Sequence, residues 1–190
     1  YLSGGSGGSA DEGASQSILS VLATNSIYQE NESAPGMDFD NGNVSPDAPA
    51  LLPKYPTLSF EDEIRYNIYF TTQNLQSFNT ADMGLITWST PRTDGTIDNA
   101  HSVIAGVTYD STRNRYLACS DGIPAKELGD TLYFKVYARL SNGTYIYSDL
   151  YNYSAEQYAY YMLEASSDSR LHNLLISMLN YGAEAQKYFG

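Results

Sequence analysis

The sequence TLYFKVYARLSNGTYIYS, residues 131–148, decides the fold that we expect for this chain. Apolar and polar side chains alternate over Thr131–Leu140, which is the period-two pattern of a strand with one buried face. Ser141-Asn142-Gly143 supplies a short turn, and Thr144–Ser148 returns in the same alternating pattern. An Asn-Gly pair between two alternating runs is the strongest short-range signal for a β-hairpin. We therefore predict an antiparallel hairpin here.

Further strands are predicted upstream of this hairpin. Glu63–Phe70 alternates apolar and polar residues, and Met83–Ser89 is a second short apolar run. A turn around Asp94-Gly95 follows the second run. Ser102–Tyr109 and Arg115–Ser120 are two more strand candidates, and the five polar residues between them predict another hairpin.

The C-terminal part of the chain changes to a helical pattern. Ser154 and Gln157 have the spacing of a capping box, which predicts a helix over residues 155–165. Asp168 is the expected N-cap of a second helix over residues 169–189, whose apolar residues recur on one face. Strands first and helices last predict an α+β fold, with an antiparallel β-sandwich-like body of short strands followed by a C-terminal helical hairpin.

The N-terminal third has a different composition. Residues 1–16 are rich in Gly and Ser and read as a linker, and the repeated Gly-Gly-Ser fits either a native or an engineered spacer. Residues 17–28 contain a short apolar run that fits a strand or one short helix. The prolines and glycines of residues 29–56 predict a segment without regular structure. We therefore expect residues 17–56 to be an extended strap and residues 57–190 to be the folded domain.

Composition excludes several classes of function. The formal net charge is -12, which repels nucleic-acid phosphates and anionic lipid headgroups. The single cysteine, Cys119, cannot form an internal disulfide. No stretch approaches the ~18 consecutive apolar residues of a membrane-spanning helix. We expect no nucleic-acid partner and no membrane insertion.

Several longer motifs resemble one family. They are IRYNIYF at Ile64–Phe70, DMGL at Asp82–Leu85, GIPAKELGDTLYF at Gly122–Phe134 and MLNYGAEAQKYF at Met178–Phe189. Together they resemble, over about residues 57–189, a module of large secreted or cell-wall-attached proteins of Gram-positive gut anaerobes. The resemblance implies an extracellular location beside other domains of the same polypeptide, such as glycosidases, adhesive repeats and immunoglobulin-binding regions. It supplies no catalytic motif.

The residues offer few candidates for catalysis. Cys119 and His101 are the only pair of nucleophile and base to consider, and a strand cysteine between apolar neighbours is more typical of a core. Two acidic clusters could supply the paired carboxylates of a glycosidase. Sequence does not give their separation, and acidic runs of this kind are usually solvated. The clusters are Glu61, Asp62 and Glu63, and Glu127 with Asp130. We therefore expect no catalytic residue and no enzymatic activity.

A metal site is weakly indicated at one place. Residues 38–43 resemble a calcium loop, but the spacing before Gly42 fails the EF-hand pattern, which needs oxygen ligands at alternating positions. A looser site formed by Asp38, Asp40, Asn43 and Asp47 stays open. We expect no cofactor and assign no metal ligand.

Tyrosine is the compositional outlier, with 18 residues in 190. Exposed tyrosines stack on sugars or anchor protein interfaces. The candidate ligand-binding residues are Tyr145, Tyr147, Tyr151, Tyr153 and Trp88, and the alternative is that these rings fill the core. The expected function is a non-catalytic extracellular binding or adhesion module that recognises a host protein, for example immunoglobulin, or a glycan. The alternatives are a structural spacer or repeat, and an accessory carbohydrate-binding domain of a secreted glycosidase.

Overall fold

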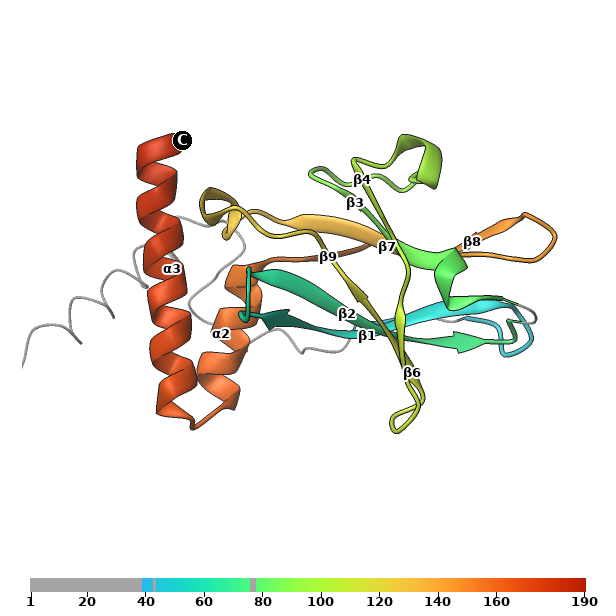
Figure 1. The fold of residues 1–190 in the computed structure, drawn as a ribbon, viewed down its shortest axis with the longest axis horizontal. Helices are drawn as coiled ribbons and strands as arrows, with labels where there is room; N and C mark the ends of the chain where they lie inside the picture. The colour runs from blue at the N-terminus through green and yellow to red at the C-terminus, as the bar shows by residue number, and fades with distance from the viewer. Residues whose placement is uncertain (1–38, 43, 76–77) are drawn as a thin grey trace, which may run out of the picture.

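The structure is a computed structural model that describes residues 39–42, 44–75 and 78–190. Two antiparallel sheets of short strands form the body, and two helices follow them in the chain. Both helices lie together at one end of the sheets (Figure 1). The predicted α+β class, with a sandwich-like β body and a C-terminal helix pair, is therefore confirmed.

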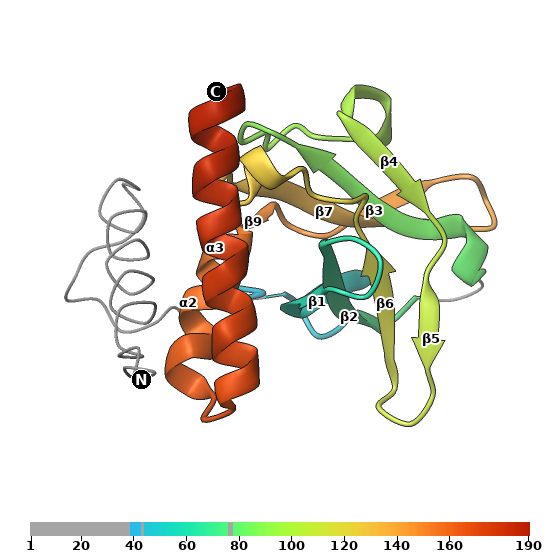
Figure 2. The same cartoon turned by 60° about the vertical axis from the view of Figure 1, so that its left-hand side comes forward.

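Each sheet has a simple order of neighbouring strands. The four-stranded sheet A has the order β1 (Ala50–Ser59), β2 (Arg65–Gln73), β6 (Arg115–Cys119) and β5 (Thr108–Asp110). In sheet B the order is β4 (Ser102–Ala105), β3 (Met83–Trp88) and β7 (Leu132–Arg139), and both β8 (Tyr145–Tyr147) and β9 (Tyr151–Tyr153) pair with β7. Figure 2 shows β5 and β6 crossing beneath the strands of sheet B.

The predicted hairpin at residues 131–148 is present as β7 and β8. Tyr137 lies opposite Tyr147, and Arg139 lies opposite Tyr145. Gly143 takes a φ of 85° in the turn, a conformation that glycine adopts without steric cost. The hairpin formed by β5 and β6 also matches its prediction.

One predicted strand is wrong in its extent. Ser102–Tyr109 is not one strand, because β4 pairs in sheet B while β5 pairs in sheet A. Gly106, with a φ of 89°, lies between them and lets the chain pass from one sheet to the other. An alternating pattern gives no sign of which sheet each half joins.

The prediction that prolines prevent regular structure up to residue 56 is also wrong. Pro53 and Pro56 lie inside β1, with Phe70 and Ile68 as their cross-strand partners. Strand β1 is an edge of sheet A, and its register shifts between the two prolines. Proline is tolerated at such edges and bulges, because the missing N–H need not join the ladder. The folded domain therefore begins before residue 57.

The described residues just before β1 also belong to the folded body. The Phe39 ring contacts the rings of Phe134 and Tyr151, with centroid distances of 5.5 and 5.0 Å. The N–H of Phe39 donates to the carbonyl of Lys54 at 2.6 Å, and Asn41 Nδ2 donates to the carbonyl of Pro53 at 2.8 Å. This part of the predicted strap packs on the domain. The linker over residues 1–16 and the apolar run over residues 17–28 lie outside the described residues.

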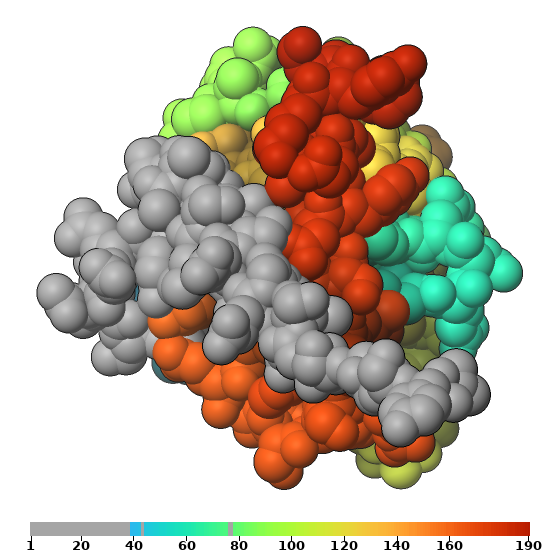
Figure 3. Space-filling model, turned by 90° about the vertical axis from the view of Figure 1, so that its left-hand side faces the viewer, coloured from blue at the N-terminus to red at the C-terminus, as the bar shows by residue number. Residues whose placement is uncertain are grey.

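The two helices begin where the sequence predicts. Helix α2 spans Ala155–Ala165 and helix α3 spans Ser169–Phe189. Figure 3 shows the C-terminal half of α3 lying at the surface along one face of the molecule. Gly182 brings α3 close to the short 3₁₀ helix η3 (Ala125–Glu127), since a Cβ there would lie 3.2 Å from the side chain of Leu128. Helix α3 therefore supports the segment that carries η3.

Two apolar clusters fill the interior. The larger one lies between the sheets and the helices, and it includes Ile68, Phe70, Met83, Leu85, Phe134, Val136 and Leu175. A smaller one on the opposite face of sheet B consists of Ile86, Trp88 and Tyr137, with Tyr145 and Tyr147 packed against it. We call this smaller group the outer cluster. Burial of apolar area on both faces of sheet B is the main source of stability there.

Replacing Ser154 by Ala removes the capping box of α2. Ser154 Oγ accepts a hydrogen bond from Gln157 N at 3.0 Å, and Gln157 Oε1 accepts one from Ser154 N at 2.9 Å. We expect Ser154→Ala to lower the free energy of unfolding by about 1 kcal/mol, the usual cost of losing an N-cap. Chemical denaturation measures this change, with Ser169→Ala on exposed helix surface as the control. Equal stability of the two variants would contradict the role of this cap.

Candidate functional site

The predicted tyrosine-rich face is mostly internal. Trp88 is 4% exposed, and its Nε1 donates to the carbonyl of Asn99 at 2.9 Å. The loop over residues 89–101 closes over its ring, because a Cβ on Gly95 would lie 2.5 Å from the ring carbons. Lys135 Nζ holds this loop by donating to the carbonyls of Thr93 and Gly95 at 2.8 and 3.1 Å. Trp88 therefore belongs to the outer cluster.

Tyr151 and Tyr153 are core residues as well. They are 8% and 5% exposed, and both rings pack around Phe39. The Tyr151 hydroxyl donates to Asn41 Oδ1 at 2.9 Å. Tyr151 and Tyr153 pack as core rings and line neither of the cavities described below, whereas Trp88, although packed in the outer cluster, also lines the first of them.

Tyr145 and Tyr147 remain half-buried on β8. Their rings stack on the same face of the strand, with centroids 6.1 Å apart, while Ile146 packs against the main core. The hydroxyl of Tyr147 accepts a hydrogen bond from the N–H of Ile97 at 3.3 Å. One part of each ring packs against the outer cluster, and the other part is exposed.

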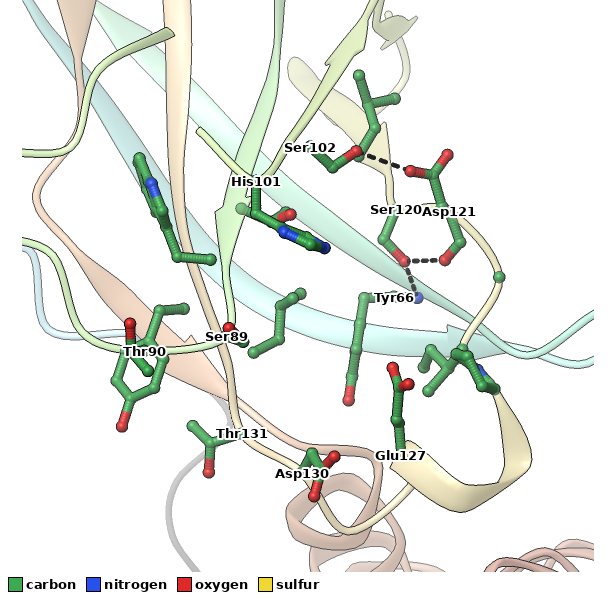
Figure 4. A pocket seen from close by; sticks show the side chains of 18 of the residues that line it. Tyr66, Ser89, Thr90, His101, Ser102, Ser120, Asp121, Glu127, Asp130 and Thr131 are labelled. Atoms are coloured by element: carbon green, nitrogen blue, oxygen red, sulfur yellow. Dashed lines mark hydrogen bonds between the residues drawn. The ribbon is translucent and has the colours of Figure 1, made fainter. Parts of the chain in front are cut away.

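A cavity lies elsewhere, between one end of sheet A and one end of sheet B. Its volume is about 800 Å³. Its walls come from β2, the segments after β3 and β6, the start of β4, and the segment from η3 into β7 (Figure 4). Residues with polar groups in these walls include Tyr66, His101, Ser102, Asp121, Glu127 and Asp130.

A second cavity of about 710 Å³ adjoins the first. Both cavities are lined by Ile104, Ser120, Asp121 and Gly122. We call the two together the inter-sheet cleft. The second cavity is also lined by Arg65, whose guanidinium forms an ion pair with Glu63.

Hydrogen bonds around Ser120 fix the wall that the two cavities share. Ser120 Oγ accepts from Tyr66 N at 2.9 Å and donates to the carbonyl of Asp121 at 2.7 Å. Ser102 Oγ, on β4 of sheet B, donates to Asp121 Oδ2 at 2.8 Å. The Asp121 carboxylate thereby links the two sheets at the cleft.

Acidic side chains dominate the charge of the first cavity. Asp121, Glu127 and Asp130 line it, and His101 is the only lining residue with a basic side chain. Within the described ranges none of the three carboxylates forms an ion pair. Unpaired carboxylates attract cations and accept hydrogen bonds from neutral donors.

Tyr66 brings a buried hydroxyl to the same cavity. The residue is 3% exposed, and its hydroxyl has no hydrogen-bond partner of ordinary geometry among the described residues. Burial raises the pKa of this hydroxyl far above its usual range, the backbone N–H of Ala155 opposes the rise, and the Asp130 carboxylate adds to it. In Figure 4 the Tyr66 ring lies between His101 on one side and Glu127 and Asp130 on the other.

The candidate catalytic residues lie apart or lack activation. Cys119 lines the second cavity and His101 lines the first. Burial raises the pKa of the Cys119 thiol, although Arg65 opposes the rise, so the thiolate is disfavoured. Glu61 and Asp62 are exposed and line neither cavity, and Glu63 lines the second cavity. Glu127 and Asp130 lie on one short segment in the same wall of the first cavity.

The loose calcium site falls partly outside the described residues, because Asp38 and Asn43 are not among them. Asp40 Oδ1 accepts a hydrogen bond from the N–H of Gly42 at 2.8 Å. Over residues 39–42, 44–75 and 78–190, no group of three His, Cys, Asp or Glu side chains is placed to hold a metal ion. In the same ranges, no helix has the length and apolar character needed to span a membrane.

Sequence reasoning missed the cleft because its residues come from distant segments. His101 and Asp121 were not proposed as a pair, and Tyr66 reads as an ordinary inward residue of a strand. The one local signal is that polar residues immediately follow β3 and β6. The ends of neighbouring strands lie together at one end of a sheet, but the sequence does not show which ends of the two sheets meet.

Replacing Gly95 by Ala tests the packing of the loop over Trp88. The added methyl group overlaps the indole ring, and forcing extra atoms into a packed site costs about 1–3 kcal/mol. We expect Gly95→Ala to lower the melting temperature and to change the fluorescence of Trp88, the only tryptophan. Thr93→Ala, in an exposed part of the same loop, is the control. Unchanged fluorescence and stability in Gly95→Ala would show that the ring is not closely covered.

Tyr151 predicts a dependence of stability on alkaline pH. Burial, with smaller contributions from Asp149 and Asp40, raises the pKa of Tyr151 from 10.0 to about 12. The unfolded chain loses this proton first, so the stabilisation is complete below pH 10 and is lost as pH rises towards 12. Denaturation at several pH values should give a smaller loss for Tyr151→Phe than for the unmodified chain. The exposed Tyr109→Phe is the control, and equal losses in both variants would contradict the assignment.

Comparisons of the chain with protein-family models, with curated proteins and with solved structures found no match.

Proposed function

We propose that this chain is a non-catalytic binding module that holds a glycan in the inter-sheet cleft. The observation that carries the proposal is the cleft itself, with adjoining cavities of about 800 and 710 Å³. Ligand sites commonly have volumes of roughly 300–1,000 Å³ and combine apolar walls with a few convergent polar groups. The volumes of both cavities fall in that range.

The chemistry of the walls suits a sugar. Tyr133 and Pro91 provide apolar surface, and a sugar ring packs its C–H face against such surfaces. Hydroxyls of Ser89, Thr90 and Thr131 line the first cavity together with the carboxylates described above. Hydroxyl groups of a glycan both donate and accept hydrogen bonds, so they match a wall that contains both kinds of partner.

The arrangement favours binding over hydrolysis. Glycosidases place two carboxyl groups on either side of the bond that they cleave. Glu127 and Asp130 both belong to one short segment, and the carbonyl of Glu127 accepts a hydrogen bond from the N–H of Asp130 at 2.9 Å. Asp121 already accepts a hydrogen bond from Ser102.

The proposed setting is extracellular, in a secreted or cell-wall-attached polypeptide with other domains. The resemblance of residues 57–189 to a module of such proteins supports this setting. A formal net charge of -12 disfavours nucleic acid and anionic membranes as partners.

A structural spacer is the second candidate. The specific observation in its favour is that Tyr151 and Tyr153, two of the tyrosines predicted to bind a ligand, are buried in the core. Of the residues predicted to recognise a host protein such as an immunoglobulin, Tyr145 and Tyr147 are half-buried. That surface is smaller than the tyrosine-rich face expected from the sequence.

The test is calorimetric titration of the 190-residue chain with neutral oligosaccharides of glucose, galactose, mannose and N-acetylglucosamine. Thr131→Trp places a bulky ring in the wall of the first cavity. We expect it to weaken glycan binding by about tenfold or more, which corresponds to ~1.4 kcal/mol.

The matched control is Thr144→Trp, which makes the same substitution at an exposed position beside Tyr145. It should leave glycan binding unchanged. Loss of binding in Thr144→Trp alone would move the site to the face of β8. An absence of binding to every oligosaccharide would reject the proposal and favour the spacer.

A further inference from the structure

Among the described residues, no basic side chain is paired with the carboxylates at the acidic end of the inter-sheet cleft. Glu127 and Asp130 face solvent at the cleft, and neither is joined in an ion pair within the described part of the chain. Lys126 precedes Glu127 on η3 but does not line either cavity. The electrostatic potential here therefore favours a ligand that carries positive charge.

The Tyr66 hydroxyl is the second feature of this end. It is enclosed by protein, it has no hydrogen-bond partner of ordinary geometry among the described residues, and Asp130 lies close enough to raise its pKa. The backbone N–H of Ala155 lies near its oxygen, and no acceptor for the hydroxyl proton is found among the described residues. Burying a polar group without a partner costs free energy, so a ligand atom that completes its bonding is favoured.

These two features need different partners. The carboxylates need N–H or O–H donors, best supplied by a cation. The Tyr66 hydroxyl needs an oxygen that accepts its proton. A lysine side chain carries only donors on its ammonium group, whereas an amino sugar carries an ammonium group together with ring and hydroxyl oxygens.

We infer that the end of the cleft formed by Tyr66, Glu127 and Asp130 is a subsite for a protonated amino sugar, so that the preferred ligand is a glycan with free amines. This inference rests on the proposed glycan-binding function and narrows it. The amine lies at the carboxylates of Glu127 and Asp130. A sugar oxygen accepts the hydrogen bond of Tyr66. N-acetylation removes the charge of the amine and with it the main attraction.

The experiment compares two oligosaccharides that differ only in acetylation, a β-linked glucosamine tetramer with free amines and its fully N-acetylated counterpart. Titration of the 190-residue chain at low ionic strength should give about tenfold tighter binding for the free-amine form, which corresponds to ~1.4 kcal/mol. The preference should shrink at about 1 M salt, where the screening length falls to ~3 Å.

Matched charge variants separate the subsite from the general negative charge of the chain. The double variant Glu127→Gln and Asp130→Asn should abolish the preference for the free amine. The control is the double variant Glu164→Gln and Glu184→Gln. It also removes two negative charges, but at exposed positions on α2 and α3 that line neither cavity. It should keep the preference, and an equal loss in both double variants would overturn the subsite.

The remaining outcomes decide between this inference and the proposed function. Equal affinity for the two tetramers rejects the amine subsite while glycan binding in the cleft stands. Binding of neither tetramer nor any neutral oligosaccharide rejects both. An oligolysine peptide that binds as tightly as the free-amine tetramer overturns the assignment to a sugar.

Tyr66→Phe should weaken the binding of the free-amine tetramer more than the binding of the oligolysine peptide. An equal effect on both affinities would contradict the role of the Tyr66 hydroxyl.

Discussion

Pairing of β7 with β3 along one edge, and with β8 and β9 along the other, places this strand in the middle of sheet B with both faces covered. Phe134 and Val136 point into the main core, while Lys135 and Tyr137 lie buried on the opposite face. A strand that is buried on both faces requires other elements of the fold to pack against each face. Sheet A and the helices supply one side, and the loop over residues 89–101 supplies the other.

This arrangement explains where the aromatic residues go. Trp88, Tyr137 and the tyrosine rings of β8 cover the second face of sheet B. On the same face, Lys135 donates hydrogen bonds to two backbone carbonyls of the loop over residues 89–101. Closing the end of the main core uses Tyr151 and Tyr153 around Phe39. The excess of tyrosine is therefore largely a consequence of a small β body that must be sealed on several sides, which is compatible with the β propensity of tyrosine.

Local signals in the sequence were sufficient for elements whose partners lie nearby in the chain. The Asn142-Gly143 turn and the Ser154–Gln157 capping box depend on a few adjacent residues, and both are present. The edge position of β1 depends on how β2 and β6 pair, which the local sequence does not show. Pro53 and Pro56 therefore predict a segment without regular structure, whereas the edge strand accommodates both. The cleft depends on even more distant pairings. Ser102 and Asp121 meet only because β4 and β6 belong to different sheets that approach each other there.

The same distinction between local and distant effects applies to charge. A net charge of -12 is a property of the whole surface and selects against anions in general. In the proposed subsite, unpaired carboxylates lie beside the buried Tyr66 hydroxyl, which has no hydrogen-bond partner among the described residues. The Ser120 bonds hold β2 to the wall beside Asp121, and helix α3 packs through Gly182 against the segment that carries Glu127. The acidic end of the cleft is thus supported by the same packing that holds the helices to the sheets, and its geometry does not depend on a free loop.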